Sequence, residues 1–433
     1  MLSVPSDAVV AFWETQCKYF HEALSQKQYL HFYHIVLGLM VAMRAHRVTD
    51  VIRLWQYVCH WTNAYAFLRS QAWQAADVAR VLWDLVWELL DRPLRLYAVV
   101  DDTTVRHAGA KKMEAVRCHH DASAQNDPCR ARKVWGHKWI LMGLAVLVTT
   151  RHWEILPITA QLVEDGMNKL TLALEIMRRL GVPASTILTV IADGWYTKRP
   201  LVEGLAAMKI HYLGKIRRDA CLYEPLPSLP PGAKRPVGRP RTKGEKIKQA
   251  DLIERPPDFA SASVAIRGCK RRVDIWHRIV TVAGWNGMTV RFVIARWTNR
   301  RKRARFLYLL CSDLTLSVKE ILRHYDARWM IEPCFCDLKQ KGGLASYSGK
   351  YARGHQAWVQ LCCVARSLLV ILCMKLKGGL IDPWRRSTQP PYITVGQQRL
   401  AMAQNFDQLA SLGQSAKNSA RPGISKCQRT EIR

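Results

Sequence analysis

Two short segments of the chain place carboxylates after apolar runs, where they could perform metal-dependent chemistry. Residues 99–104 contain Asp101 and Asp102, and residues 191–196 contain Asp193. Such apolar runs predict buried strands, and carboxylates at the ends of separate strands can share divalent ions, because Mg²⁺ prefers oxygen ligands. Two ions held in this way suit phosphoryl transfer. Aspartate is also a common turn residue, so an ordinary turn is the alternative for each segment.

A third segment, residues 325–339, is predicted to form one helix with a polar stripe. At about 100° per residue, four side chains fall within about 60° of one another: Tyr325, Arg328, Glu332 and Lys339. The stripe offers a carboxylate for a metal and three groups for phosphate oxygens. A solvated helix face with ordinary charge pairs has the same pattern. Pro333 predicts a kink, which makes the position of Lys339 less certain.

The elements that must position these residues alternate between strands and helices. Hydrophobic periodicity predicts helices before residue 90, at 19–24, 31–42 and 78–90. Apolar runs predict strands at 96–100, 139–149, 153–162, 186–192 and 210–216, with helices at 169–180 and 200–208. Further strands are predicted at 273–283, 288–297 and 306–311, and helices at 317–331 and 356–376. This order predicts a mixed α/β sheet.

Changes in composition divide the chain into five segments. We expect a helical N-terminal DNA-binding domain over 1–92, with a plain packing domain as the alternative. The first part of an α/β core covers 93–216, a β-rich insertion with a basic loop covers 217–315, and the second part of the core covers 316–377. The tail, 378–433, is rich in Gln, Ser, Arg and Pro, and we expect poor order there.

The charge of the chain indicates a polyanionic partner. The 433 residues include 65 Lys and Arg against 34 Asp and Glu, a net charge of +31, and nucleic acid is the commonest partner of such a protein. An anionic membrane is the rival, but the apolar runs 139–150 and 367–374 are shorter than the roughly 18–20 residues of a membrane span. No secretory signal is apparent. We therefore expect no membrane contact.

The cysteines give no clear metal site. Thirteen are scattered along the chain, which predicts reduced thiols. Two groups invite a zinc interpretation but lack the C-x2-C spacing of structural sites: Cys118, His119, His120 and Cys129, and the pair Cys334 and Cys336. Burial of single thiols is the simpler explanation.

A basic loop contains an Arg-Pro unit that resembles an AT-hook core. Residues 236–241 read Pro-Val-Gly-Arg-Pro-Arg, and such an extended unit can place Arg239 and Arg241 in a narrow minor groove. A solvated loop that touches phosphates without sequence preference is the alternative.

The three chemical segments together resemble bacterial insertion-sequence DDE transposases, in the branch with the signature Y-x2-R-x3-E-x6-K (YREK). Tyr325, Arg328, Glu332 and Lys339 match that signature at every spacing, and VVDDTT and IADGWY resemble the two aspartate blocks. The resemblance covers about residues 95–375 and implies an RNase H-like catalytic core, beside the β-rich insertion and the helical N-terminal domain.

The resemblance also implies the site. Asp102, Asp193 and Glu332 would be the catalytic residues and would bind two Mg²⁺ or Mn²⁺ ions. Asp101 competes with Asp102, which is preferred because the family's acid directly precedes its threonine. Tyr325, Arg328 and Lys339 would hold DNA phosphates.

The implied function is cut-and-paste transposition by hydrolysis at transposon ends and transfer of the 3′-hydroxyl. The partners would be double-stranded DNA, namely the inverted-repeat ends and the target, and a second copy of the chain in a homodimer. The location would be the bacterial cytoplasm, at the nucleoid. A metal-dependent nuclease or resolvase with the same triad, and a catalytically dead inhibitor, are the alternatives.

Replacing both Arg239 and Arg241 by Ala should weaken non-specific DNA binding and flatten its salt dependence. Each phosphate contact releases counterions from the DNA when the protein binds, so losing contacts reduces this release. The slope of the logarithm of the binding constant against the logarithm of the salt concentration should therefore become smaller by roughly one to two units. Binding titrations over a salt series measure it. An unchanged slope would show that the loop does not touch DNA.

Overall fold

The computed structural model describes residues 6–42, 47–53, 60–107, 112–120, 133–148, 152–226, 243–247, 249, 259–266, 269–298, 304–375, 398–399 and 402–403. Arg239 and Arg241 lie outside these residues, as does nearly all of the predicted tail.

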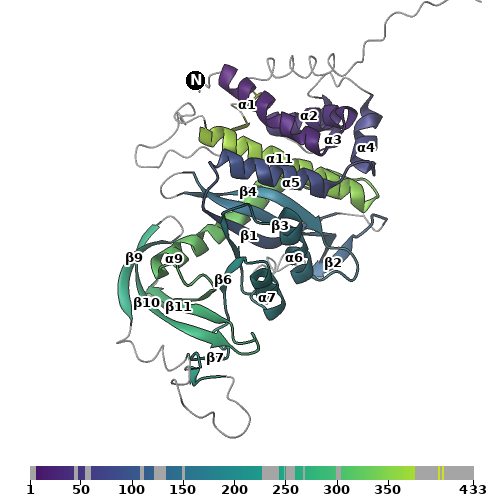
Figure 1. Cartoon of the computed structure of the whole chain (residues 1–433). Coiled ribbons are helices and arrows are strands. Elements are labelled where there is room, and N and C mark those ends of the chain that lie inside the picture. The colour runs from purple at the N-terminus through teal and green to yellow at the C-terminus, as the bar shows by residue number, and fades with distance from the viewer. Residues whose placement is uncertain are drawn as a thin grey trace, which may run out of the picture.

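Five strands form the centre of the molecule in the spatial order β4-β3-β1-β5-β6 (Figure 1). Their bounds are β1 Arg95–Arg106, β3 Lys133–Leu147, β4 Trp153–Leu162, β5 Ile187–Ala192 and β6 His211–Lys215. β1 pairs antiparallel with β3 and parallel with β5, and β5 pairs parallel with β6. The first three strands are therefore an antiparallel meander and the last two return in parallel. This is an RNase H-like core, as expected.

The sheet continues beyond the core into the segment between β6 and the next helix. The outer side of β6 pairs with β12, which is followed by β11 and β10. The bounds in this segment are β7 Leu222–Tyr223, β8 Lys246–Ile247, β9 Ala260–Ile266, β10 Cys269–Val282, β11 Thr289–Thr298 and β12 Ala304–Cys311. The three strands predicted there are confirmed as β10, β11 and β12. The strands β7, β8 and β9, and the core's short β2, Arg117–His120, were not predicted.

Helices surround the core part of the sheet. Before β1 lie α1 Ser6–Lys18, the 3-10 turn η1 Tyr19–Glu22, α2 Gln26–Val41, α3 Val48–Arg53, α4 Trp61–Arg69 and α5 Ala75–Leu89. After β4 come α6 Lys169–Leu180 and α7 Arg199–Ala207, and after β12 come α9 Val318–Ala327, the 3-10 turn η4 Arg328–Met330, α10 Ile331–Gln340 and α11 Ala352–Lys375. The helices α2, α4 and α5 pack on α11. A DNA-binding role for the N-terminal helices stays a prediction.

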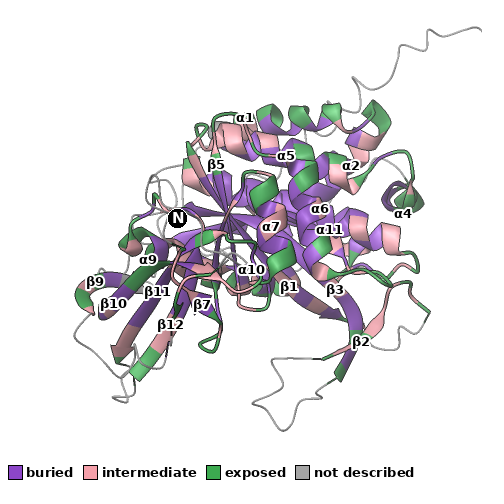
Figure 2. Cartoon of the chain, turned by 60° about the horizontal axis from the view of Figure 1, so that its bottom comes forward, coloured by how far each residue is buried: buried purple, intermediate pink, exposed green. Residues whose placement is uncertain are grey.

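Helix α11 covers the outer edge of β4. Its side chains bond to backbone groups of that strand: Gln356 to Ala160 and Leu162, Gln360 to Ile158, and Ser367 to Pro157. An uncovered edge strand would leave a row of unpaired backbone groups. The helix thus completes the hydrogen bonding of the sheet, which explains polar residues on a helix this deeply buried (Figure 2).

Helix α11 is also long and apolar enough to cross a membrane, although the apolar runs of the sequence did not indicate a span. Of its most apolar window, 89% is buried inside the protein. Burial of this kind is what a core helix of a folded domain shows. The helix packs between β4 and the N-terminal helices.

Two of the differences between predicted and observed elements concern the segments that carry the acids. β1 was predicted to end near residue 100, but it runs on to Arg106, since it stays paired with β3 as far as Gly136. The segment 325–339 was predicted to be one helix, but it is divided at η4. Pro333 has no N–H to donate to the carbonyl of Trp329, so the regular helix cannot pass this point. Pro333 lies in the first turn of α10, where no such bond is required.

A buried ion pair joins β4 to α11, and its loss should destabilise the fold. Arg366 donates to Glu154 at 3.0 Å, and their side chains are 2% and 5% exposed. Glu154→Gln should lower the free energy of unfolding by about 3 kcal/mol, because it removes the carboxylate charge 3.0 Å from the buried guanidinium of Arg366, whose ion pair with Asp337 is longer, at 3.5 Å. Urea unfolding followed by circular dichroism measures this.

The matched control is Glu203→Gln, which breaks the exposed pair between Glu203 and Arg199 on α7. It should change the free energy of unfolding by less than about 1 kcal/mol. If the two substitutions lower the free energy of unfolding equally, the buried ion pair contributes no more to stability than the exposed one.

Candidate active site

The first aspartate pair and Asp193 meet where the pairing of β1 with β5 ends. The last paired residues are Val100 and Ala192, so Asp101 and Asp193 follow at the same level on neighbouring strands. Side chains at matching levels of parallel strands point to the same face of a sheet. Because β5 ends at Ala192 while β1 continues, the sheet has a gap beside Asp101.

Asp101 faces the helices that carry the proposed third acid. Its Oδ2 accepts a hydrogen bond from Nη1 of Arg328 at 3.2 Å, and its Oδ1 accepts from the backbone N of Asp102. Burial, together with the charges of Asp193 and Asp102, raises the pKa of Asp101 to about 7, although Arg328 opposes the shift. A buried carboxyl beside other acids has the surroundings of a cation site.

Asp102 points to the opposite face of β1, since successive side chains of a strand alternate. Its Oδ1 accepts from Nζ of Lys169 at 2.6 Å and from the hydroxyl of Tyr196 at 3.1 Å, and Nζ of Lys138 lies 3.6 Å from Oδ2. Two lysines therefore balance the charge of Asp102. The geometry favours Asp101 over Asp102 as the partner of Asp193, in contrast to the preference drawn from the order of residues.

Glu332 is connected to Asp101 through Arg328. The Nη2 atom of Arg328 lies 3.7 Å from Oε1 of Glu332, so one guanidinium contacts both carboxylates. The side chain of Glu332 is 46% exposed. Tyr325 lies at the same place: burial raises its pKa to about 12, while Arg328 lowers it. Three of the four residues of the predicted stripe are thus neighbours despite the break between α9 and α10.

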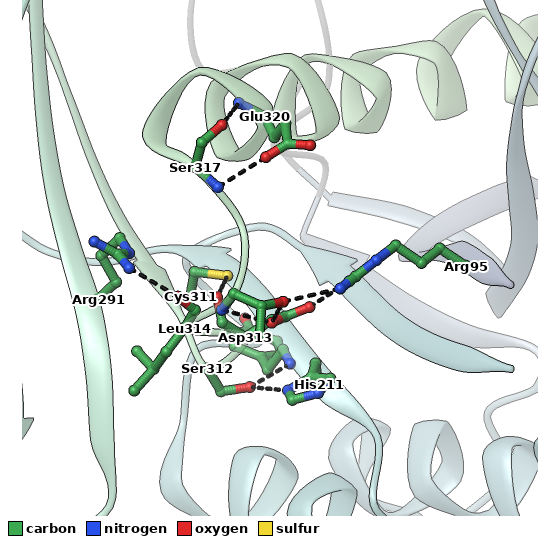
Figure 3. Close-up of polar contacts among 11 residues, drawn as sticks. Arg95, His211, Arg291, Cys311, Ser312, Asp313, Leu314, Ser317 and Glu320 are labelled. Carbon is green, nitrogen blue, oxygen red and sulfur yellow. Dashed lines mark hydrogen bonds and ion pairs between the residues drawn. The ribbon is translucent and has the colours of Figure 1, made fainter.

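A buried acid holds the start of α9 against β1 (Figure 3). Asp313 accepts from Nη1 of Arg95, the first residue of β1, at 2.6 Å, and from the backbone N of Thr315 at 2.9 Å. Ser317 then caps α9, and its backbone N donates to Glu320. These bonds fix the start of α9 against Arg95 of β1. Arg95 lies six residues before Asp101 on the same strand.

The acids line a cavity of about 790 Å³. Its walls contain Asp101, Asp102, Asp193, Lys138, Lys169, Trp195 and Lys339, but not Glu332. Lys169 and Trp195 had not been predicted as site residues. Lys169 lies 3.6 Å from the centre of the Trp195 ring. Nothing in the local sequence marks Lys169, whereas Trp195 is part of the segment IADGWY.

The donor set fits divalent ions that prefer oxygen. Asp101, Asp193 and Glu332 offer carboxylates from three separate elements, as Mg²⁺ or Mn²⁺ sites require. The like charges of Asp101 and Asp193 lie close enough to raise the pKa of Asp101, and a bound cation would relieve that repulsion.

The pKa of Asp101 predicts a specific dependence of stability on pH. The pKa is raised from 3.8 in the unfolded chain to about 7, so the stabilisation is full below pH 4 and is lost as pH rises through 7. Asp101→Asn keeps a neutral side chain. In EDTA, the free energy of unfolding of the wild type relative to this variant should fall by about 3–4 kcal/mol between pH 4 and 8. A constant difference would show that Asp101 is ionised throughout.

Comparisons with known proteins identify the family of the chain. Residues 19–280 match the model of the family described as "DDE superfamily endonuclease", a range that contains Asp101 and Asp193 and ends before Glu332. The comparison with curated proteins gave no match. Among solved structures, the piggyBac transposase synaptic complex with hairpin DNA is similar at 12% identity and a TM-score of 0.41, over 92% of this chain and 73% of that one. Because the family model spans more than half of the sequence, the chain belongs to the DDE superfamily of endonucleases.

Proposed function

We propose that the protein is a cut-and-paste transposase of a bacterial insertion sequence, of the YREK branch. The observation that carries the proposal is the single guanidinium of Arg328 between Asp101 and Glu332, with Asp193 level with Asp101. Arg328 thus connects an acid of β1 with an acid of α10, and Asp193 follows β5 at the level of the first of them. The signature residues Tyr325, Arg328, Glu332 and Lys339 supply the support for the branch.

In this proposal Asp101, Asp193 and Glu332 are the metal ligands, and Asp102 positions them. Two Mg²⁺ or Mn²⁺ ions, when bound, would supply Lewis acidity and an activated water. Asp102 ties Lys169 and Tyr196 to β1. The contacts of Asp102 with two lysines leave it less suited to a cation than Asp101.

The cations around the acids suit the phosphates of a DNA backbone. Lys138, Lys169 and Lys339 line the same cavity as Asp101 and Asp193, and ammonium groups bind phosphate oxygens as point charges. Arg328 can exchange its contact with Asp101 for a phosphate once a cation neutralises the acids. The residues would thereby hold a phosphodiester beside the carboxylates.

The proposed partners follow from charge and reaction. The net charge of +31 favours double-stranded DNA, which the protein would meet at the bacterial nucleoid in the cytoplasm. A complex that cuts both ends of an element together needs two active sites, and a homodimer would supply them. Arg239 and Arg241 would add contacts in the minor groove.

Two other functions would use the same site. A nuclease or resolvase would cut DNA without joining it to a target, and an inhibitor would bind DNA without cutting. The acids in place favour an enzyme over the inhibitor. Terminal inverted repeats in the DNA around the coding region would favour the transposase over the nuclease.

Conservative substitutions should separate the roles of the acids. Asp101→Asn, Asp193→Asn and Glu332→Gln should each reduce cleavage of a DNA fragment carrying the element's ends by far more than about tenfold, because each removes a charge that holds a cation. Asp102→Asn should retain more activity. Cleavage is followed on gels with Mg²⁺ or Mn²⁺, with EDTA as the blank.

Each variant should bind the same fragment in Ca²⁺ nearly as well as the wild type, which separates chemistry from binding. If Asp101→Asn cleaves DNA and Asp102→Asn does not, then Asp102, and not Asp101, is the first metal ligand. Normal cleavage by Glu332→Gln, or cleavage undiminished in EDTA, would refute the triad.

A further inference from the structure

Three histidines from distant parts of the sequence meet in the interior, away from the carboxylates. His107 directly follows β1, His137 lies in β3, and His355 lies in the first turn of α11. One nitrogen of each ring lies within 4.8 Å of the others. His137 is fully buried and His355 is 3% exposed. Together we call them the histidine cluster.

Backbone carbonyls fix the orientation of two of these rings. Nε2 of His137 donates to the carbonyl of Glu114 at 2.8 Å, and Nε2 of His355 donates to the carbonyl of Gly349 at 2.7 Å. A carbonyl can only accept, so both protons are on Nε2 and both Nδ1 atoms keep a lone pair. A ring that donates one N–H to a carbonyl and turns its other nitrogen inward is the usual state of a metal-binding histidine.

The third ring completes the set. Nε2 of His107 lies 2.9 Å from Nδ1 of His137, the nitrogen that carries the lone pair. Two nitrogens bound to one tetrahedral zinc at about 2.0–2.1 Å are about 3.3 Å apart. The separations in the cluster, from 2.9 Å to at most 4.8 Å, bracket that value. Small rotations of the rings would therefore bring all three to one ion.

The surroundings suit a neutral, nitrogen-rich site. Burial disfavours the charged form of an imidazole, and two of the three rings are buried. The neutral ring is the form that binds metals. Tyr347 packs edge-on against His355, and its buried hydroxyl has no hydrogen-bond partner among the described residues. A polar partner is thus missing from this part of the interior.

The backbone around the cluster is arranged for close contact. A Cβ at Gly136, next to His137, would come within 2.0 Å of the carbonyl oxygen of Val105, so only glycine fits there. The backbone N of Glu114 donates to Lys350, and the carboxylate of Glu114 accepts from the N of Ala352 at the start of α11. The segment around Glu114 therefore joins the cluster to α11.

We propose that His107, His137 and His355 bind one zinc-class divalent cation, which fastens the start of α11 to β1 and β3. Imidazole ligands suit Zn²⁺ and its neighbours, whereas Mg²⁺ prefers the oxygens of the carboxylate site. The two sites thus take different metals. The ion would join residues separated by 30 and 218 positions in the chain, and it would stabilise the fold by binding the native state only.

Metal binding by the full chain tests the proposal. The Glu332→Gln chain is used, so that the carboxylate site is weakened and the result does not depend on the proposed transposase activity. After dialysis against EDTA, Zn²⁺ is added and excess is removed on a desalting column. We expect about one retained Zn²⁺ per chain and a higher melting temperature than without metal.

Single substitutions locate the ion. His107→Gln and His355→Gln should lose both the retained Zn²⁺ and the rise in melting temperature. His119→Gln is the matched control: His119 lies on β2, outside the cluster, and in the group Cys118, His119 and His120 that the sequence offered as a zinc site. It should retain the ion. Loss of the ion in His119→Gln, with retention in the other two, would overturn the proposal.

A spectrum of the unsubstituted histidine cluster decides the matter if those variants fail to fold. Co²⁺ replaces Zn²⁺ in the Glu332→Gln chain, and strong visible bands without a near-ultraviolet sulfur-to-cobalt band would indicate tetrahedral nitrogen ligands. A sulfur band would assign the ion to cysteines, and the absence of any retained metal would show that the histidines only bond to one another. Either result refutes the site.

Discussion

The active site depends on the place where β5 stops and β1 goes on. Up to Val100 and Ala192 the two strands share backbone hydrogen bonds, which fixes their relative height more rigidly than any side-chain contact could. The next residues, Asp101 and Asp193, therefore lie side by side without a ligand to gather them. Beyond them β1 continues to pair with β3, while β5 has ended. Asp101 and Asp193 line the cavity at this point.

The third acid depends on a break in a helix. Pro333 prevents a continuous helix from α9 into α10, and the 3-10 turn between them presents Arg328 toward β1. From the other end, Asp313 ties the approach to α9 to Arg95, and Arg366 of α11 contacts Asp337 of α10. Glu332 thus belongs to a segment that is anchored on both sides, although its own side chain is half exposed.

Much of the fold followed from the sequence because its signals are local. Alternating or continuous apolar runs predicted β4 and α6 at their observed bounds, 153–162 and 169–180, and Gly181 takes a positive φ of 68° at the end of α6. The length of β1 could not be predicted, because polar residues 101–104 are kept in the strand by pairing with β3. β2 and β9 likewise form because a longer neighbour pairs with them.

The site was predictable only in part, for the same reason. Residue order predicted Asp193 and the four signature residues, and it preferred Asp102 to Asp101. The register of β1 against β5, which residue order does not contain, instead brings Asp101 level with Asp193. Lys138, Lys169 and the three histidines come together only through the tertiary fold. Whether Asp102, Asp193 and Glu332 all act in catalysis stays a prediction.

The continuity of the sheet has a mechanical consequence. β6 of the core is bonded through its main chain to β12, and β12 to β11 and β10, so the strand-rich segment cannot swing about a hinge without breaking a ladder of backbone bonds (Figure 1). A long molecule that binds both β10 and the carboxylates therefore meets two contact regions whose separation is held by the paired strands. The number and spacing of the strands between β10 and the carboxylates set the distance from the binding contact to the reacting bond. This distance is the same for every molecule that binds in this way.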